Sequence, residues 1–402
     1  MAAALGLRGT GAFSTTGTPG PSDQRPKNWR EMMLMLFPNG EMPLTALLSK
    51  LATQNTDDPE FNWWEKGLPT QRTLIDFGAG YAAGITAMEV DDATMFKAGH
   101  VVLVERTNEI MFIVSDPTTA TGIVVVRGKG EVAAAAILDD DALLIIGTVH
   151  EEGADSPNIV TYSPTKVFNY TQIFRTTLGM TRTAKKTRLS WDRTGPYREA
   201  KREALQLHGI EMEKAFFFGQ RKEEIGPNGQ PRRTTRGART FITTNALTDA
   251  DTDGVWGEAD FSRVFESVFR YGSSEKLAFC GSTAIGVFTS WAKLGLNTTI
   301  NMEPTSTTYG MKIAHILTPF GDLYLKSHPL MSDHPVYRKD CVILDLQFLK
   351  YRYIDDTTFK KNIQAPGVDS AKDEFLTEAG LEMWHEKAHS KLTNMVSFSP
   401  TE

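Results

Sequence analysis

The longest amphipathic pattern in the chain predicts a helix from Pro196 to Gly219. Proline suits the first helical position, where its missing N–H costs nothing, and glycine suits a left-handed residue that ends a helix. At 3.6 residues per turn, one side carries a narrow apolar stripe made by Tyr197, Ala200, Ala204, Leu207, Ala215 and Phe218. Most other positions are polar or charged, so we expect them to face water or charged partners.

The segment before this helix has the composition of an extended arm. Residues Val167–Leu178 are rich in β-branched and aromatic side chains, which favours a strand. The next ten residues are basic and carry little apolar surface. Because such an arm cannot bury a core of its own, we expect its partner to be another chain. Its candidates for contacts with other subunits or with DNA are Arg182, Lys185, Lys186 and Arg188.

Residues 72–152 change to a β pattern. Short apolar runs separated by turn residues predict strands at 101–104, 110–114, 123–126 and 143–146. Strands this short and evenly spaced predict a small β-sandwich or barrel. The segment holds 5 Lys or Arg against 13 Asp or Glu, a net charge of −8. We expect a solvent-facing domain inserted between the two halves of the extended arm.

Helical and strand patterns alternate from 259 to 350. Apolar residues at i, i+3, i+4, i+7 and i+8 predict a buried helix with Asp260 as its N-cap and Gly272 as its stop. A strand at 276–280, a helix capped by Ser282, a hairpin of 313–317 and 323–326, and a strand at 341–344 follow. This alternation predicts a compact α+β domain. Beyond Tyr351 we expect an extended, polar chain.

The termini and the cysteines set further limits. Residues 1–30 have the composition of a flexible arm, and short helices are expected at 29–37 and 43–51. No run of about 18 apolar residues predicts a membrane span, and the first residues lack a secretory signal pattern. Cys280 and Cys341 lie in apolar, strand-like runs, which predicts buried free thiols and assembly in a reducing compartment.

Charge is spread unevenly over the 402 residues. The net formal charge is −6, yet residues 166–239 hold 17 Lys or Arg against 7 Asp or Glu, a local charge of +10. This region is expected to meet either nucleic acid or the acidic parts of neighbouring copies, and the sequence does not choose between them. The same alternatives apply to a second basic cluster, which consists of Arg232, Arg233, Arg236 and Arg239.

One motif has a catalytic pattern. The run His385–His389 matches H-E-x-x-H, which on a helix would place two imidazoles on one face to hold zinc. No matching motif supplies a third ligand, so we expect a structural or interface role. No other stretch combines a nucleophile, a base and an orienting group. We therefore expect no catalytic residues, no metal, no cofactor and no enzymatic activity.

Several ordered motifs occur together in the second half of the chain. They are Tyr170–Phe174, Thr181–Ala184, Glu211–Phe216 with Gly219, Arg236–Ala238, Thr318–Asp322, His328–Leu330, Leu344–Asp345, Glu378–Glu382 and Glu386–His389. Taken together they resemble the major capsid proteins of tailed double-stranded-DNA bacteriophages, over roughly residues 155–395. The resemblance also gives the H-E-x-x-H run a structural explanation.

The resemblance implies an α+β, Hong Kong 97-like fold with an added small all-β domain. An N-terminal arm and the outgoing limb of an extended loop would occupy 1–71, and the acidic β domain 72–152. The return limb would occupy 153–195, the spine helix and peripheral domain 196–258, and the axial domain 259–350. Residues 351–402 would complete the peripheral domain and form a C-terminal tail.

The resemblance also implies a function. Copies of the chain would form the hexamers and pentamers of an icosahedral capsid in the virion, assembled in the host cytoplasm. Implied partners are identical copies, the portal, scaffold or decoration proteins, and packaged double-stranded DNA through nonspecific contacts, with no membrane. Two alternatives stay open: a nucleic-acid-binding or packaging protein that uses the basic region 166–239, and a zinc hydrolase that uses the H-E-x-x-H run.

Overall fold

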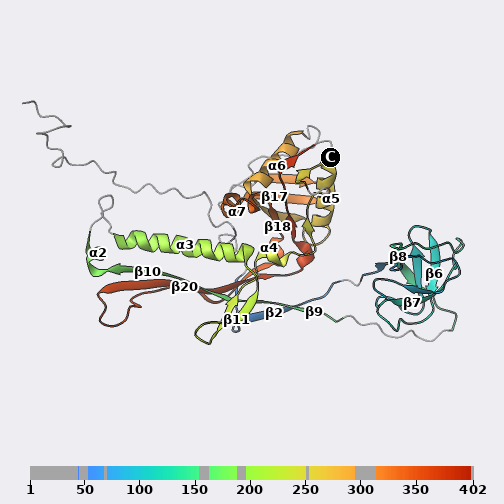
Figure 1. The fold of residues 1–402 in the computed structure, drawn as a ribbon, viewed down its shortest axis with the longest axis horizontal. Helices are drawn as coiled ribbons and strands as arrows, with labels where there is room; N and C mark the ends of the chain where they lie inside the picture. The colour runs from blue at the N-terminus through green and yellow to red at the C-terminus, as the bar shows by residue number, and fades with distance from the viewer. Residues whose placement is uncertain are drawn as a thin grey trace, which may run out of the picture. The chain divides into compact units, whose positions relative to one another are not determined.

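The computed structural model describes residues 44, 53–67, 70–153, 163–187, 196–249, 253–294 and 314–399 (Figure 1). The arm and the two short helices expected before residue 52 lie outside the described residues, apart from Leu44. Contacts divide the chain into two units. Unit 1 consists of Met1–Asn62 and Phe168–Glu402, and unit 2 of Trp63–Val167.

Unit 1 contains a sheet of four strands in the order β1-β19-β20-β10. Their bounds are β1 Thr53–Asn55, β10 Gln172–Thr181, β19 Leu349–Lys360 and β20 Ser370–Met383. The pairs β10–β20 and β19–β20 are antiparallel, whereas β1 runs parallel to β19. The long helix α3, Pro196–Phe218, packs against β10 and β20, and the short helix α2, Arg182–Lys186, follows β10 (Figure 1).

The strand before α3 has its partner within the same chain. β10 forms a regular ladder with β20 from the Gln172–Ala379 pair to the Thr181–Ser370 pair. Its side chains Phe174 and Leu178 are buried. The expectation that residues 167–178 need another chain is therefore wrong for β10. Its partner β20 belongs to the stretch beyond Tyr351, which was expected only to be extended and polar. This pairing was not predicted, because the paired residues are about two hundred positions apart in the sequence.

Helix α3 confirms the predicted long helix, but its buried face differs from the predicted stripe. Ala204, His208, Met212 and Phe216 recur every four residues and are buried. Leu207, which the pattern placed in the stripe, is 56% exposed. The buried face shifts because polar His208 has buried hydrogen-bond partners, which counting apolar positions cannot predict.

Gly219 ends α3 for a different reason from the one expected. Its backbone does not have the positive φ of a left-handed stop. A Cβ at this position would lie 2.4 Å from the carbonyl oxygen of Ala215 and 2.5 Å from that of Thr235. Glycine is needed here because two backbone segments approach closely.

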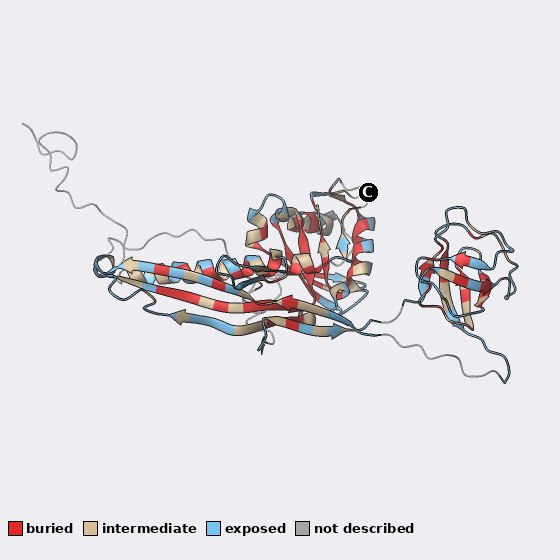
Figure 2. Cartoon of the chain, turned by 60° about the horizontal axis from the view of Figure 1, so that its bottom comes forward, coloured by how far each residue is buried: buried red, intermediate tan, exposed pale blue. Residues whose placement is uncertain are grey.

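A second sheet of unit 1 contains the strands expected between 259 and 350. Its strand order is β13-β21-β18-β15-β17-β16. The bounds are β13 Ala246–Leu247, β15 Glu275–Cys280, β16 Ala314–Thr318, β17 Gly321–Ser327, β18 Cys341–Leu344 and β21 Ser390–Leu392. Residues 246–247 and 390–392 were expected in the peripheral domain, whereas β13 and β21 are strands of this sheet. Figure 2 shows the concentration of buried residues in this part of unit 1.

Two helices pack on the second sheet, and both start differently from the prediction. α5 spans Glu258–Phe269, so Asp260 is not the N-cap. It lies at the third helical position, where its carboxylate accepts a hydrogen bond from the N–H of Gly257 at 3.1 Å. α6 spans Ser282–Leu294, so Ser282 is its first residue and not a cap. Phe261 and Phe288 bring the two helices together in one core with the sheet.

Short elements complete unit 1. They are the hairpin β11 Lys222–Ile225 and β12 Pro231–Thr234, α4 Ala238–Phe241, α7 Pro329–Asp333, the pair β14 Val255–Trp256 and β22 Ser397–Phe398, and 3-10 turns at Tyr337–Lys339, Leu346–Phe348 and Glu386–Ala388. Where the chain passes between the units, β2 Glu60–Glu65 pairs with β9 Thr165–Tyr170.

Unit 2 is a β-barrel, and its four predicted strands are confirmed. Its strand order is β3-β8-β5-β6-β7-β4. The bounds are β3 Arg72–Leu74, β4 Ala87–Glu89, β5 His100–Val104, β6 Glu109–Ile113, β7 Gly122–Val126 and β8 Ala142–Thr148. A bridge between Ile75 and Val90 joins the two outermost strands. The ring of strands is thereby closed around an apolar core, which removes open sheet edges.

Candidate assembly surfaces

The first basic cluster expected from the sequence lies on α2. Its helix residues Arg182, Lys185 and Lys186 are exposed. Arg182 forms an ion pair with Asp369 at 3.0 Å, but both side chains are more than 60% exposed, so water screens the pair. The ammonium group of Lys185 lies 4.8 Å from the centre of the Tyr197 ring. Arg188 lies outside the described residues.

The second basic cluster divides into two arginines that pair within their own hairpin and two that bond to other parts of the subunit. Arg232 and Arg233 lie on β12, and they pair with Glu224 and Glu223 of the opposite strand β11. These ion pairs reduce the positive charge that the hairpin presents. An anionic partner would therefore meet a nearly neutral surface here.

Arg236 and Arg239 are used within the subunit. Arg236 donates to the carbonyl oxygen of Thr240 at 2.9 Å, and burial lowers the pKa of its guanidinium. Arg239 donates to the carboxylate of Asp340 at 2.8 Å and lies over the ring of Tyr337. The contacts of Arg239 connect α4 to the loop before β18.

The structure does not bring the two clusters together. Cluster one is on α2, beside the N-terminal end of α3, and cluster two follows the C-terminal end of α3 (Figure 1). A helix of 23 residues is roughly 35 Å long at 1.5 Å per residue. A single contact with a small ligand therefore cannot use both clusters, whereas an extended partner can.

The H-E-x-x-H run does not form a helix. His385 has a left-handed φ of 51°, and Glu386–Ala388 makes one 3-10 turn. The carboxylate of Glu386 accepts hydrogen bonds from the backbone N–H groups of Thr243 and Thr244, the latter at 2.6 Å. Glu386, which would be the general base of a zinc hydrolase, therefore connects two loops of the subunit. The geometry required by the zinc alternative is therefore not formed.

His389, the last residue of this run, is fully buried. Its Nδ1 accepts a hydrogen bond from the N–H of Asp345 at 3.2 Å, and its Nε2 lies 3.1 Å from the carbonyl oxygen of Trp384. Burial lowers the pKa of His389 to about 4. The ring is therefore neutral at physiological pH and joins β18 to the end of β20.

A polar chain under α3, centred on the buried side chains of His208 and Thr377, was not predicted from the sequence. His208 is hydrogen-bonded through Nδ1 to Thr176 of β10 at 3.0 Å and through Nε2 to Thr377 of β20 at 2.8 Å. The hydroxyl of Thr377 lies 2.9 Å from that of Thr357 on β19. One side chain thus connects the helix to two neighbouring strands. The only signal in the sequence is a histidine at the four-residue spacing of Ala204 and Met212.

A second missed contact connects α3 to the α+β part of unit 1. Glu213 and His328 are both fully buried, with 3.0 Å between Oε1 and Nε2. The same Glu213 oxygen accepts a hydrogen bond from the N–H of Leu44 at 2.8 Å. The carboxylate therefore joins the spine helix to the residue that precedes α7 and to a residue near the N-terminus.

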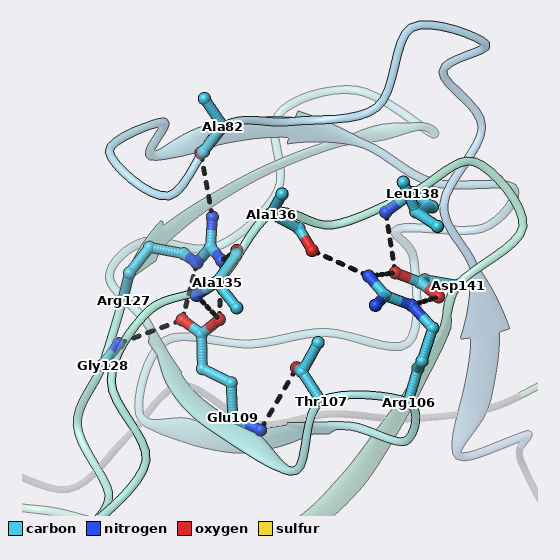
Figure 3. Close-up of polar contacts among 10 residues, drawn as sticks. All are labelled: Ala82, Arg106, Thr107, Glu109, Arg127, Gly128, Ala135, Ala136, Leu138 and Asp141. Atoms are coloured by element: carbon cyan, nitrogen blue, oxygen red, sulfur yellow. Dashed lines mark hydrogen bonds and ion pairs between the residues drawn. The ribbon is translucent and has the colours of Figure 1, made fainter.

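In unit 2 two arginines fix the long loop between β7 and β8 (Figure 3). Glu109 is fully buried and accepts from Arg127 at 2.6 Å and from the N–H groups of Gly128 and Ala135 at 3.1 and 3.2 Å. Arg127 also donates to the carbonyl oxygen of Ala82. Every partner of this carboxylate belongs to the strand end or to the loop, so the pair sets the conformation of the loop.

The second arginine of unit 2 acts at the other end of the same loop. Arg106 donates to Asp141 at 2.7 Å and to the carbonyl oxygen of Ala136 at 2.7 Å. Asp141 also accepts from the N–H of Leu138 at 2.7 Å. The pKa of Asp141 is lowered, chiefly by its hydrogen bond with Arg106.

The described part of the chain offers neither a metal site nor a membrane-spanning helix. Within it, no three His, Cys, Asp or Glu side chains are grouped so that they could hold a metal ion. None of its helices has the length and apolar character needed to cross a bilayer. Cys280 and Cys341 are free and buried, as expected, on neighbouring strands of the second sheet.

Comparison with known proteins gives one family match and several relatives. The family described as SU10 major capsid protein matches residues 9–396. A major capsid protein of Pseudomonas phage PaMx41 is 27% identical over 371 residues, which cover 87% of this chain and 83% of that protein. A structure of Mycobacterium phage Bobi aligns with a TM-score of 0.48 and 9% identity, covering 95% of this chain and 99% of the other. The capsid of Myoviridae Phage XM1 aligns with a TM-score of 0.46 and 10% identity, covering 91% and 96%.

Proposed function

The chain belongs to the family of SU10 major capsid proteins, and from this premise we propose that its copies form the hexamers and pentamers of an icosahedral shell around the double-stranded DNA of a tailed phage. The observation that carries the proposal is the family match over residues 9–396, which include all of unit 2 and most of unit 1. A shell subunit has a structural role and needs no catalytic centre.

The architecture of unit 1 supports this role. A spine helix on long antiparallel strands, next to a compact α+β domain, is the Hong Kong 97-like arrangement that the sequence motifs implied. The two basic clusters of unit 1 lie beyond opposite ends of α3, and many weak contacts at such separate surfaces sum to a stable assembly. The portal and scaffold or decoration proteins belong to the same proposal as further partners, with assembly in the host cytoplasm.

The basic residues of α2 are the proposed contact with acidic parts of neighbouring copies. Lys185 and Lys186 are exposed, and among the described residues neither forms an ion pair. Outside residues 166–239 the chain carries a net charge of −16, so an identical copy offers complementary surface. Arg232 and Arg233 remain weaker candidates, because they pair with glutamates of their own hairpin.

Charge reversal at α2 tests this contact. The double variant Lys185→Glu and Lys186→Glu should lower the yield of closed shells at least ten-fold, as counted by negative-stain electron microscopy. The far-ultraviolet circular dichroism and melting temperature of the dispersed subunit should stay unchanged, because both side chains are exposed. The matched control, Lys185→Arg with Lys186→Arg, keeps the charge and should assemble normally. Wild-type yields from the reversed variant would refute the contact.

Packaged DNA is the alternative partner of the basic region. Binding to phosphates releases counterions, so the affinity of dispersed subunits for duplex DNA would fall steeply with salt. Wild-type protein that forms no shells but binds DNA in this way would overturn the capsid proposal in favour of a packaging protein. Shells of uniform diameter would support it.

A further inference from the structure

The two edges of the four-stranded sheet are built differently. β1 covers only residues 351–353 of β19, and the rest of β19 contains register shifts on either side of Asp355. Bulges and exposed carboxylates hinder the addition of another strand to an edge. β10 has neither protection. Its ten-residue ladder is regular, and Gln172–Thr181 contains no Asp or Glu and no proline.

The direction of each backbone group of β10 follows from the ladder register. The N–H of Arg182 donates to the carbonyl oxygen of Asp369, one step beyond the Thr181–Ser370 pair. Backbone groups alternate in direction along an antiparallel strand, so the even-numbered residues of β10 bond to β20. The odd-numbered residues, 173 to 181, direct both N–H and C=O away from β20.

Two neighbouring hydrogen bonds agree with this alternation. The N–H of Thr171, an odd residue, donates to the carbonyl oxygen of Pro59 at 2.8 Å and not to β20. Lys372 lies opposite Gly179 in the ladder, and its carbonyl oxygen accepts from Ile363 at 2.8 Å on the far side of β20. The Gly179–Lys372 pair is therefore not hydrogen-bonded, as the alternation requires.

The outward edge of β10 is open in the described part of the chain. No described strand pairs with it, and residues 173–181 span roughly 30 Å at 3.4 Å per residue. At its start lies a pocket of about 390 Å³, lined by Ile173 and Glu378 and by the turn that contains Pro227. The Ile173 side chain is 57% exposed. The edge thus offers main-chain partners and, at one end, a pocket for a side chain.

We propose that the free edge of β10, residues 173–181, receives an extended strand from a second copy of this chain. This inference rests on the proposed function and identifies one of its subunit contacts. Main-chain pairing needs a peptide partner, which nucleic acid cannot supply. The edge leads into basic Arg182, Lys185 and Lys186, whereas the chain outside 166–239 carries −16, so a strand of an identical copy has complementary charge.

Hydrogen exchange at single-residue resolution tests the edge in the full chain. In dispersed subunits the amides of 173, 175, 177, 179 and 181 should exchange at least a hundred-fold faster than those of 174, 176, 178 and 180. In assembled shells the two sets should become similarly slow, because the outward amides then donate to the added strand. Outward amides that stay fast in shells would overturn the proposal. Outward amides already slow in dispersed subunits would show that the chain covers its own edge, and would also overturn it.

Proline substitution tests the edge by a second route. Thr177→Pro removes an outward N–H, which the ladder with β20 does not use, and introduces a ring that blocks an approaching strand. We expect the dispersed subunit to fold and the yield of shells to fall at least ten-fold. The control Thr177→Ala keeps the N–H and should assemble normally. If Thr177→Pro does not fold, the exchange measurement on the wild-type chain decides.

The two proposals fail in different ways. Wild-type shells with an unprotected β10 edge, or normal assembly of Thr177→Pro, would refute strand addition while the capsid function stands. A wild-type chain that forms no shells under any assembly condition would refute both.

Discussion

The buried His389 makes the stability of unit 1 depend on pH. Its folded-state pKa is about 4, against an ordinary value of 6.5, because burial disfavours the charged ring. The unfolded chain therefore takes up a proton between pH 6.5 and 4, while the folded chain resists it. The contribution of His389 to the free energy of unfolding has its maximum above pH 6.5. It should fall by about 3 kcal/mol as the pH drops to 4.

Urea unfolding of the wild type and His389→Gln at several pH values measures this contribution. Glutamine keeps one acceptor and one donor for Asp345 and Trp384 but does not titrate. The variant should lose stability less steeply over the same pH range. Equal slopes would show that His389 does not titrate in the unfolding reaction. The pKa of His208 is also lowered by burial, and it contributes equally to both proteins.

At the scale of single residues, sequence patterns predicted burial well for apolar side chains and poorly for polar ones. The apolar runs around Cys280 and Cys341 identified two buried thiols correctly. The pattern could not identify Glu213, because its buried partner His328 is 115 residues away and Leu44 is 169 residues away. A polar side chain is buried only when such a partner exists, and one-dimensional periodicity carries no record of it.

The Arg127–Glu109 pair should determine whether the β7–β8 loop is ordered. Both side chains are nearly or fully buried, so removal of one partner leaves an unpaired charge, at a cost of about 3 to 5 kcal/mol. Arg127→Met should therefore speed amide exchange in residues 128–141 and in β6. The measurement is hydrogen-exchange mass spectrometry of the full chain.

A matched control lies elsewhere on the same barrel. Arg72 and Glu105 form an ion pair with good geometry, but both side chains are solvent-exposed. Arg72→Met should therefore leave the exchange of residues 128–141 unchanged. If both variants had the same small effect, the buried pair would not hold the loop.

At the scale of elements, the pairing of a strand was predicted only where its partner strand is close in the sequence. Four of the six barrel strands were predicted, each within two residues, and among them β5, β6 and β7 pair with each other in chain order. β3 and β4 were not predicted. The spine helix was predicted over its full length from its own periodicity. For β10 the strand was predicted but its partner was not, because β20 lies about two hundred residues further along the chain. The polar appearance of residues 351–402 concealed the strand β20, in which nine of the 14 residues are buried.

Removal of the barrel of unit 2 tests whether the barrel and unit 1 fold independently. The barrel has its own core, and Arg72 lies opposite Leu144 in the β3–β8 ladder, so the ends of the inserted domain are close together. Replacing residues 70–150 with a short Gly-Ser linker should leave the melting temperature of unit 1 unchanged within a few degrees. The excised segment, produced separately, should fold as a β domain. Loss of cooperative unfolding in either part would contradict this independence.

For the whole molecule, the sequence predicted the α+β class, and its motifs implied the Hong Kong 97-like arrangement. The inserted domain was placed at 72–152, and the ordered barrel runs from Arg72 to Thr148. The assignment of residues after 351 to a separate peripheral domain did not anticipate that β21 joins the second sheet. A short strand of three residues contributes too little pattern to reveal which sheet it enters.

The long separation between β10 and β20 has a consequence for the order of events on the ribosome. Arg175 and Glu374 are 199 residues apart, which corresponds to roughly 10 to 40 s of translation. The barrel can complete itself during that interval, whereas β10 and the apolar face of α3 must wait without their sheet. Nascent unit 1 is therefore a natural client for chaperones, and slow translation of its last fifty codons would lengthen its exposure to misfolding.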